Sequence, residues 1–151
     1  MKKIMFVCHG NICRSPMAEF VLLDMIKKRG LTEKITVASS ATSTEEIGND
    51  THRSTKAILT KYGIPFSRRE ATQLTRADYA KYDLFVGMDS ANIRNMHRIF
   101  GSDPDGKVVK LLDLTDRGGD VADPWYTGNF EATYRDVTDG CEALLALILS
   151  K

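Results

Sequence analysis

The chain has 151 residues, of which 42% are hydrophobic and 27% are charged, and its 21 basic and 20 acidic residues give a formal net charge of +1. This length predicts a single domain, residues 1–151, with enough apolar residues for a proper core. The near balance of charge argues against partners recognised by bulk charge, so we expect no nucleic-acid and no membrane partner.

Apolar runs and helix caps predict an alternating series of strands and helices along the chain. In chain order the predicted elements are a strand at 4–7, a helix at 16–29, a strand at 35–39, a helix at 54–62, a short helix at 75–82, a strand at 84–88, a helix capped by Ser90 and ending at Phe100, a strand at 108–112 and a helix at 130–149.

This alternation predicts an α/β fold, in which right-handed crossovers build a mostly parallel sheet with helices on both faces. Ligands of such sheets bind at the carboxyl ends of the strands, beside the point where the strand order reverses. The segment "CHGNICRS" follows the first predicted strand. We therefore expect this segment to lie at a ligand site.

The segment after the first strand has the features of an anion-binding loop. Pro16 suits the first turn of a helix, which would make Ser15 the N-cap and direct the positive end of the helix dipole toward the loop. Gly10 and Asn11 tolerate a positive φ, so the loop can curl and direct successive N–H groups inward. These residues predict a site for an oxyanion.

Cys8 and Arg14, at the two ends of this loop, add chemistry to it. A cysteine next to a helix N-terminus and a guanidinium is stabilised as the nucleophilic thiolate. The planar fork of Arg14 can hold two oxygens of one phosphoryl group. The Ser15 hydroxyl could donate to the sulfur when the sulfur leaves. The alternative, an ordinary strand–helix turn, requires neither Cys8 nor Arg14.

The sequence "VCHGNICRSPMAE", together with the late "DPWY", resembles the signature of the low-molecular-weight protein tyrosine phosphatase family. The resemblance implies a three-layer domain with a four-stranded parallel sheet, a phosphate-binding loop after the first strand and hydrolysis of phosphotyrosine or small aryl phosphates through a phosphocysteine. The residues it implies are the nucleophile Cys8, the phosphate-binding Arg14, the assisting Ser15, Asn11 with supporting Ser39 for loop shape, and the general acid Asp123. The remaining loop residues, expected to line the phosphate site, are His9, Gly10, Ile12 and Cys13.

Asp123 also fits the acid role on chemical grounds. A phenolate leaving group has a conjugate acid with a pKa of about 10, so a proton donor accelerates its departure. The alternative is a plain Asp-Pro turn. Rival acids in the same aperiodic region, without the Pro and aromatic neighbours, are Asp113, Asp116 and Asp120. The rings of Trp125 and Tyr126 are expected to line a slot for a flat phenyl group, although partial burial in the core is the alternative.

The three cysteines, Cys8, Cys13 and Cys141, form no disulfide framework, which favours a cytoplasmic protein. Cys13 is expected either to be a small buried side chain or to pair with Cys8 on oxidation, and Cys141 is expected in the core. The spacing of cysteines and of the scattered histidines matches no metal site, so no metal and no cofactor is expected. We expect a monomer or a weak homodimer.

Two segments depart from the family pattern. The stretch "STEEIG" has glutamates where the family often has an aromatic residue at the mouth of the site, and Glu45 or Glu46 there would repel acidic peptides. The stretch "RREATQL" lacks the His and Arg that usually precede its Gln, which predicts a different support for the loop.

Three other functions compete with tyrosine phosphatase. Protein arginine phosphatases share the loop, but Ile12 and the pair Trp125-Tyr126 argue against that branch, which commonly has Thr and Gly there. A thioredoxin-linked arsenate reductase needs two further cysteines near the third strand, and none lies between Cys13 and Cys141. An inactive phosphotyrosine-binding module would be expected to lack Cys8 or Asp123.

Overall fold

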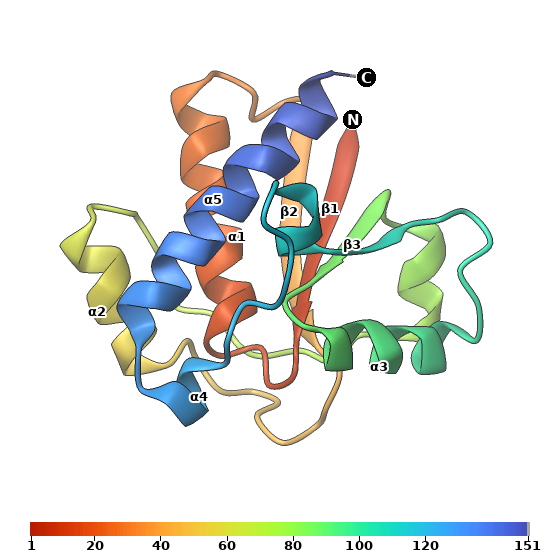
Figure 1. The fold of residues 1–151 in the computed structure, drawn as a ribbon, viewed down its shortest axis with the longest axis horizontal. Helices are drawn as coiled ribbons and strands as arrows, with labels where there is room; N and C mark the ends of the chain where they lie inside the picture. Colours follow the sequence, from red (N-terminus) through yellow and green to blue (C-terminus); the bar gives the residue numbers. More distant parts are fainter. Residues whose placement is uncertain (151) are drawn as a thin grey trace.

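Four parallel strands form the central sheet of the computed structural model, which describes residues 1–150 (Figure 1). In chain order they are β1 (Lys2–Cys8), β2 (Ile35–Ala41), β3 (Leu84–Gly87) and β4 (Val108–Lys110). The order across the sheet is β2-β1-β3-β4, and each neighbouring pair is parallel. The four-stranded parallel sheet is therefore confirmed.

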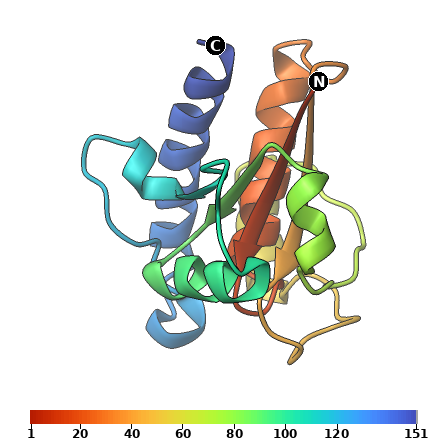
Figure 2. The same cartoon turned by 90° about the vertical axis from the view of Figure 1, so that its right-hand side faces the viewer.

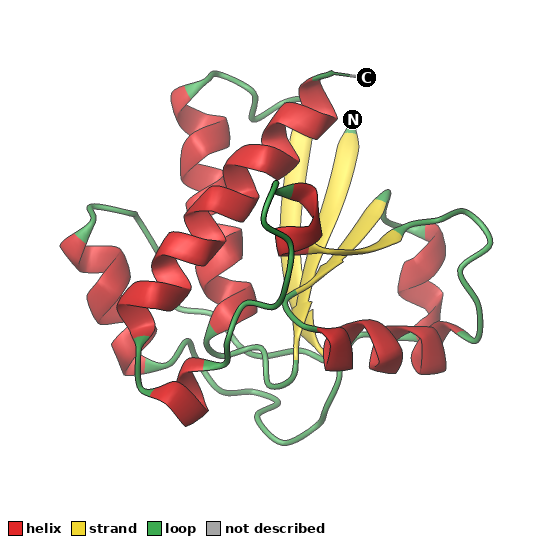
Figure 3. Ribbon diagram, in the orientation of Figure 1, coloured by secondary structure: helices red, strands yellow, loops and turns green. Residues whose placement is uncertain are grey.

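Helices cover both faces of this sheet (Figure 3). They are α1 (Arg14–Lys28), α2 (Arg53–Lys61), α3 (Ser90–Phe100), α4 (Pro124–Thr127) and α5 (Phe130–Leu149), with the 3₁₀ helices η1 (Arg76–Ala80) and η2 (Leu111–Leu114). Helices α1 and α5 pack on one face of the sheet, whereas α3 and η1 lie over the other face. Figure 2 shows the molecule from the side of α3 and η1. Of the helices in residues 1–150, none has the length and apolarity needed to cross a bilayer.

Strand β1 supplies side chains to both faces, as expected from the alternation of side chains along a strand. Ile4 and Phe6 join the core cluster that contains Leu22 of α1 and Leu144 of α5. Met5 and Val7 join the second cluster, with Phe85, Met96 and Phe100. Because both faces are buried, β1 reads in sequence as one continuous apolar run rather than an alternating one.

Every predicted boundary lies within about two residues of the observed one, and three of the predicted caps and ends were wrong. Helix α1 begins at Arg14 with Cys13 as its N-cap, so Ser15 is not the cap. Asp89 caps α3 and forms a reciprocal capping box with Asn92, so Ser90 is the first residue of that helix. The fourth strand ends at Lys110, and the chain continues into the 3₁₀ helix η2 where a strand was expected. The capping box of Thr75 and Asp78 is confirmed.

The topology places one loop at the reversal of strand order. The connection after β1 leads to β2 on one side of the sheet, and the connection after the adjacent β3 leads to β4 on the other side, so the strand order reverses between β1 and β3. The β1–α1 loop and helix α4 lie at the carboxyl end of β1, while the N- and C-terminal ends of the drawn chain lie at the other end of the sheet (Figure 1).

Candidate active site

The loop from Cys8 to Arg14 is held in a curl by Asn11. Asn11 is buried and has φ 59°, in the left-handed region that asparagine tolerates better than most residues. Gly10 does not use this region, so the expected positive φ is found at Asn11 alone of the two. A Cβ at Gly10 would lie 3.3 Å from Cγ of Glu46, so the neighbouring rim segment packs close to the loop there.

The sulfur of Cys8 lies inside this curl and receives hydrogen bonds from the loop. The backbone N–H of Asn11 donates to Sγ at 3.3 Å, and Oγ of Ser15 lies 3.0 Å from Sγ. Nδ2 of Asn11 donates to the Ser15 hydroxyl at 2.8 Å. Since this hydroxyl oxygen already accepts from Asn11, its own hydrogen is free to point to the sulfur.

The same asparagine connects the loop to the half-buried carboxylate of Glu19 behind it. Nδ2 of Asn11 also donates to Oγ of Ser39 at 2.9 Å, and the Ser39 hydroxyl donates to Glu19 at 2.5 Å. Burial raises the pKa of Glu19, and the bond from Ser39 partly offsets that effect. A chain of hydrogen bonds thus runs from the Glu19 carboxylate through Ser39, Asn11 and Ser15 to the sulfur. Ser39 has the supporting position expected of it.

Arg69 supports the loop from the segment "RREATQL", which lacks the His and Arg that usually precede its Gln. Its guanidinium donates to the backbone carbonyl of Asn11 at 2.8 Å and also to Oδ1 of Asn11. The backbone N–H of Thr72 donates to the same Oδ1 at 3.1 Å. Both donors and both acceptor positions of the Asn11 amide are therefore in use, which fixes its orientation. Burial lowers the pKa of Arg69, while Glu19 and Cys8 act in the opposite direction.

Arg14 is the most constrained cation of the site, with only 2% of its surface exposed. Nη1 binds Asp89 at 2.7 Å and the carbonyl oxygen of Val121 at 2.9 Å, and Nη2 lies 3.4 Å from Oδ2 of Asp123. Burial alone would lower the pKa of Arg14, but Cys8 and the two carboxylates raise it overall. The guanidinium therefore stays charged at a fixed place beside the sulfur.

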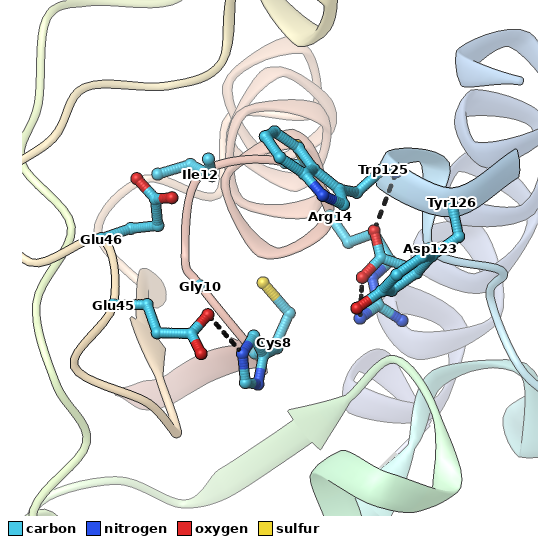
Figure 4. A pocket seen from close by; sticks show the side chains of 11 residues that line it. Cys8, Gly10, Ile12, Arg14, Glu45, Glu46, Asp123, Trp125 and Tyr126 are labelled. Atoms are coloured by element: carbon cyan, nitrogen blue, oxygen red, sulfur yellow. Dashed lines mark hydrogen bonds and ion pairs between the residues drawn. The ribbon is translucent and has the colours of Figure 1, made fainter. Parts of the chain in front are cut away.

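Asp123 sits on the opposite side of the pocket from the rim glutamates (Figure 4). It is the N-cap of α4, where Oδ1 accepts from the backbone N–H of Trp125 at 3.0 Å. The rival Asp120 is engaged elsewhere, because it binds Lys110 at 2.9 Å and the N–H of Ser90. Neither Asp113 nor Asp116 is among the residues that line this pocket.

One pocket brings most of the predicted residues together, and the members that line it are Cys8, His9, Gly10, Ile12, Cys13, Arg14, Glu45, Glu46, Asp123, Trp125 and Tyr126. Asn11, Ser15 and Ser39 lie behind the sulfur rather than on the pocket surface. Trp125 and Tyr126 are 61% and 85% exposed, so their rings edge the opening and are not part of the core. His9 pairs with Glu45 at 2.9 Å on the other edge.

The sequence did not reveal four residues that build this site, namely Glu19, Arg69, Asp89 and Val121. One signal was available: Glu19 follows Ser15 by four residues on α1, which places both on one face of the helix. No cluster of His, Cys, Asp and Glu able to hold a metal ion occurs within residues 1–150.

The chain matches the family model described as low molecular weight phosphotyrosine protein phosphatase over residues 3–151. It is 40% identical over 150 residues to the low molecular weight protein-tyrosine-phosphatase YfkJ of Bacillus subtilis, with 98% of this chain and 96% of that protein covered. The crystal structure of YfkJ superposes with a TM-score of 0.96, covering 99% of this chain and 96% of that one.

Two further solved structures share the fold. The low molecular weight protein tyrosine phosphatase SP-PTP from Streptococcus pyogenes is 39% identical, with a TM-score of 0.89 over 100% of this chain and 95% of that one. A structure described as drosophila arginine phosphatase has a TM-score of 0.87 over 98% of each chain at 24% identity. That second likeness shows a shared fold and does not extend to activity.

Proposed function

The chain belongs to the low molecular weight phosphotyrosine protein phosphatase family, and we propose that Cys8, Arg14 and Asp123 are the residues with which it hydrolyses phosphotyrosine. It is a protein-tyrosine phosphatase of the kind that uses a cysteine nucleophile. The observation that supports the residue roles is their meeting in one pocket, where the Cys8 sulfur accepts from the backbone N–H of Asn11 and lies 3.0 Å from the Ser15 hydroxyl, beside the buried Arg14. The family match over residues 3–151 supports a single phosphatase domain.

In the first step, the Cys8 thiolate attacks phosphorus in line with the phenolic oxygen. Arg14 and the loop N–H groups hold the equatorial oxygens, on which negative charge gathers in the transition state. Asp123 donates its proton to the leaving phenolic oxygen, so a neutral phenol departs. The product is a phosphoryl group on Cys8, with Asp123 now a carboxylate.

In the second step, water attacks the phosphocysteine and restores the enzyme. The Asp123 carboxylate removes a proton from the attacking water, which returns the acid to its starting state. Sulfur now leaves as a thiolate, and the Ser15 hydroxyl, 3.0 Å away, donates to it as the charge develops. Arg14 and the N–H groups again stabilise the phosphoryl oxygens, so the chain's own groups supply all the positive charge in this mechanism.

A substrate panel tests the proposed function directly. We expect phosphotyrosine peptides to be hydrolysed much faster than phosphoserine or phosphoarginine peptides, and EDTA to leave the rate unchanged. The exposed rings of Trp125 and Tyr126 edge the opening where a phenyl group would lie. Preference for phosphoarginine would replace this function by arginine phosphatase, and loss of activity with EDTA would refute the metal-free mechanism.

We also propose that Cys8 and Cys13 form a redox pair. Cys13 is buried and lines the same pocket, and burial together with Cys8 and Asp123 raises the pKa of Cys13 to about 12. Cys13 is thus a thiol at neutral pH, so peroxide should oxidise Cys8 first, to a sulfenic acid. Condensation of that sulfenic acid with the Cys13 thiol forms the disulfide and releases water.

Mild peroxide should therefore inactivate the enzyme reversibly, and a peptide map should show Cys8 joined to Cys13. In Cys13→Ser the inactivation should become irreversible, whereas the control Cys141→Ser, a fully buried thiol of α5, should behave as the wild type. Overoxidised Cys8 with a free Cys13 thiol in the wild type would remove the protective role.

We propose a cytoplasmic location for the protein. The three cysteines are free in the structure, which supports a reducing, cytoplasmic location. The net charge of +1 supports a substrate that is a phosphotyrosine protein or small aryl phosphate rather than a nucleic acid or membrane surface. We propose that the protein acts as a monomer or a weak homodimer.

A further inference from the structure

We propose that His52 is a positioning residue that connects the phosphate-binding loop to the acid-bearing segment by holding Trp125 at the pocket edge. The inference deepens the proposed function and rests on it for its kinetic consequences. His52 lies just before α2, outside the residues that line the pocket, and the mechanism above makes no use of it. Three separate contacts support the assignment.

The first contact fixes His52 to the phosphate-binding loop. Its backbone N–H donates to the carbonyl oxygen of Ile12 at 2.8 Å. Ile12 lies between Asn11 and Cys13 and lines the pocket. The backbone position of His52 is therefore set by the same loop that surrounds the Cys8 sulfur.

The second contact fixes the direction of the imidazole ring. Nδ1 of His52 accepts from the backbone N–H of Ser54 at 3.1 Å and so serves as the N-cap of α2. Histidine is an unusual N-cap, because serine, threonine, asparagine and aspartate satisfy this position with smaller side chains. One of these smaller residues would cap α2 but would place no ring against Phe130 and Trp125.

The third set of contacts joins the imidazole ring to two aromatic residues, Trp125 of the acid-bearing segment and Phe130. The imidazole stacks on Phe130, at the start of α5, with ring centroids 5.6 Å apart and an interplanar angle of 12°. It also meets the indole of Trp125 edge to face, at 5.8 Å and 82°. Both geometries are favourable for aromatic pairs. Trp125 is 61% exposed, and its indole packs against the His52 ring at the edge of the pocket.

Trp125 in turn is joined to the general acid. Its backbone N–H donates to Oδ1 of Asp123 at 3.0 Å, and both residues face the pocket (Figure 4). A shift of the indole therefore changes the wall that meets the substrate's aromatic ring, and a shift that also moves the Trp125 backbone changes the cap that orients the carboxylate. Small displacements of this kind carry large kinetic costs, since the reacting groups must meet within a narrow distance.

Two substitutions separate the ring of His52 from its capping role. His52→Asn keeps a good N-cap acceptor and the backbone N–H but removes the ring. His52→Phe keeps an aromatic ring and loses the cap. We expect His52→Asn to raise KM for aryl phosphates roughly two- to tenfold, the factor that an aromatic pair can supply, and His52→Phe to restore most of it. Inhibition by inorganic phosphate should be unchanged in both, because Arg14 and the loop N–H groups remain.

Fluorescence tests the contact without any substrate, since Trp125 is the single tryptophan of the chain. Acrylamide should quench Trp125 more strongly in His52→Asn than in the wild type or in His52→Phe. The control His97→Asn, an exposed histidine of α3, should leave both quenching and KM unchanged. Circular dichroism confirms that each variant is folded before comparison, and His52→Ser, which also keeps a capping acceptor and removes the ring, replaces the Asn variant if that one does not fold.

The outcomes for the contact and for the function can be told apart. Equal quenching in the wild type and His52→Asn, or a His52→Phe variant that matches neither wild-type quenching nor wild-type KM, would overturn the inference. Increased quenching in His52→Asn without any aryl phosphatase activity in the wild type would keep the contact and refute the proposed function. In a double-variant cycle, His52→Asn should add little to Trp125→Ala, and full additivity of the two effects on KM would also overturn the inference.

Discussion

Replacing Cys8 by serine should abolish turnover of phosphotyrosine, with a fall in rate on the order of 10⁴-fold or more, because removing a covalent nucleophile removes the whole two-step route. A serine hydroxyl at this position would not be ionised at neutral pH, and the loop N–H of Asn11 that now donates to sulfur would have no thiolate to stabilise. Binding of inorganic phosphate should survive, since it depends on Arg14 and the loop N–H groups. Isothermal calorimetry and steady-state kinetics on the same preparation measure both quantities.

Cys141→Ser is the matched control for this substitution. Its thiol is also fully buried but lies in the core cluster between the sheet and α5, away from the pocket. This variant should lose thermal stability, because a hydroxyl in an apolar core is poorly satisfied, while each folded molecule keeps its activity. Substantial hydrolysis by Cys8→Ser, above that of a blank preparation, would mean that Cys8 is not the nucleophile.

Asp123→Asn should slow phosphotyrosine by about 10²- to 10⁴-fold in the phosphorylation step, the usual contribution of a general acid. Asparagine is as good an N-cap as aspartate, so α4 and the bond from the Trp125 N–H should persist. The amide cannot give up a proton to the phenolic oxygen. A dinitrophenyl leaving group needs no proton, so dinitrophenyl phosphate should be slowed far less.

Rapid mixing is needed to observe this difference, because Asp123→Asn also weakens the base that activates water in the second step. The burst of leaving group reports the first step alone. Asp120→Asn is the matched control, since this carboxylate lies in the same segment but pairs with Lys110 and Ser90. Equal slowing of both leaving groups in the burst would leave Asp123 a purely structural role.

The sequence was most informative where the site is local. Cys8, Asn11 and Arg14 lie in one short loop between a buried strand and a helix, so their spacing and residue types were enough to predict an oxyanion site. Asp123 was preferred to the neighbouring aspartates as the acid because Pro124 and two aromatic residues follow it. Local rules failed at Ser15, since the helix begins two residues earlier than Ser-Pro suggests and the hydroxyl contacts the sulfur instead of capping the helix.

The rest of the site depends on contacts between distant segments, which a single sequence does not record. Asp89 reaches Arg14 across 75 positions, and Arg69 reaches Asn11 across 58. Their pairing is determined by the strand order and by the paths of the loops after β2 and β3. The segment "RREATQL" indicated altered support for the loop, yet only the fold shows that Arg69 itself supplies that support.

The most direct test of the mechanism is to trap the covalent intermediate. Asp123→Asn should be mixed with dinitrophenyl phosphate, denatured rapidly and mapped by mass spectrometry. Phosphorylation should remain fast because the leaving group needs no acid, and hydrolysis should be slow because the base is missing, so the intermediate accumulates. The account predicts one phosphoryl group per active chain, on Cys8. A phosphoryl group on any other residue, or a leaving-group burst with no phosphorylated chain, would contradict it.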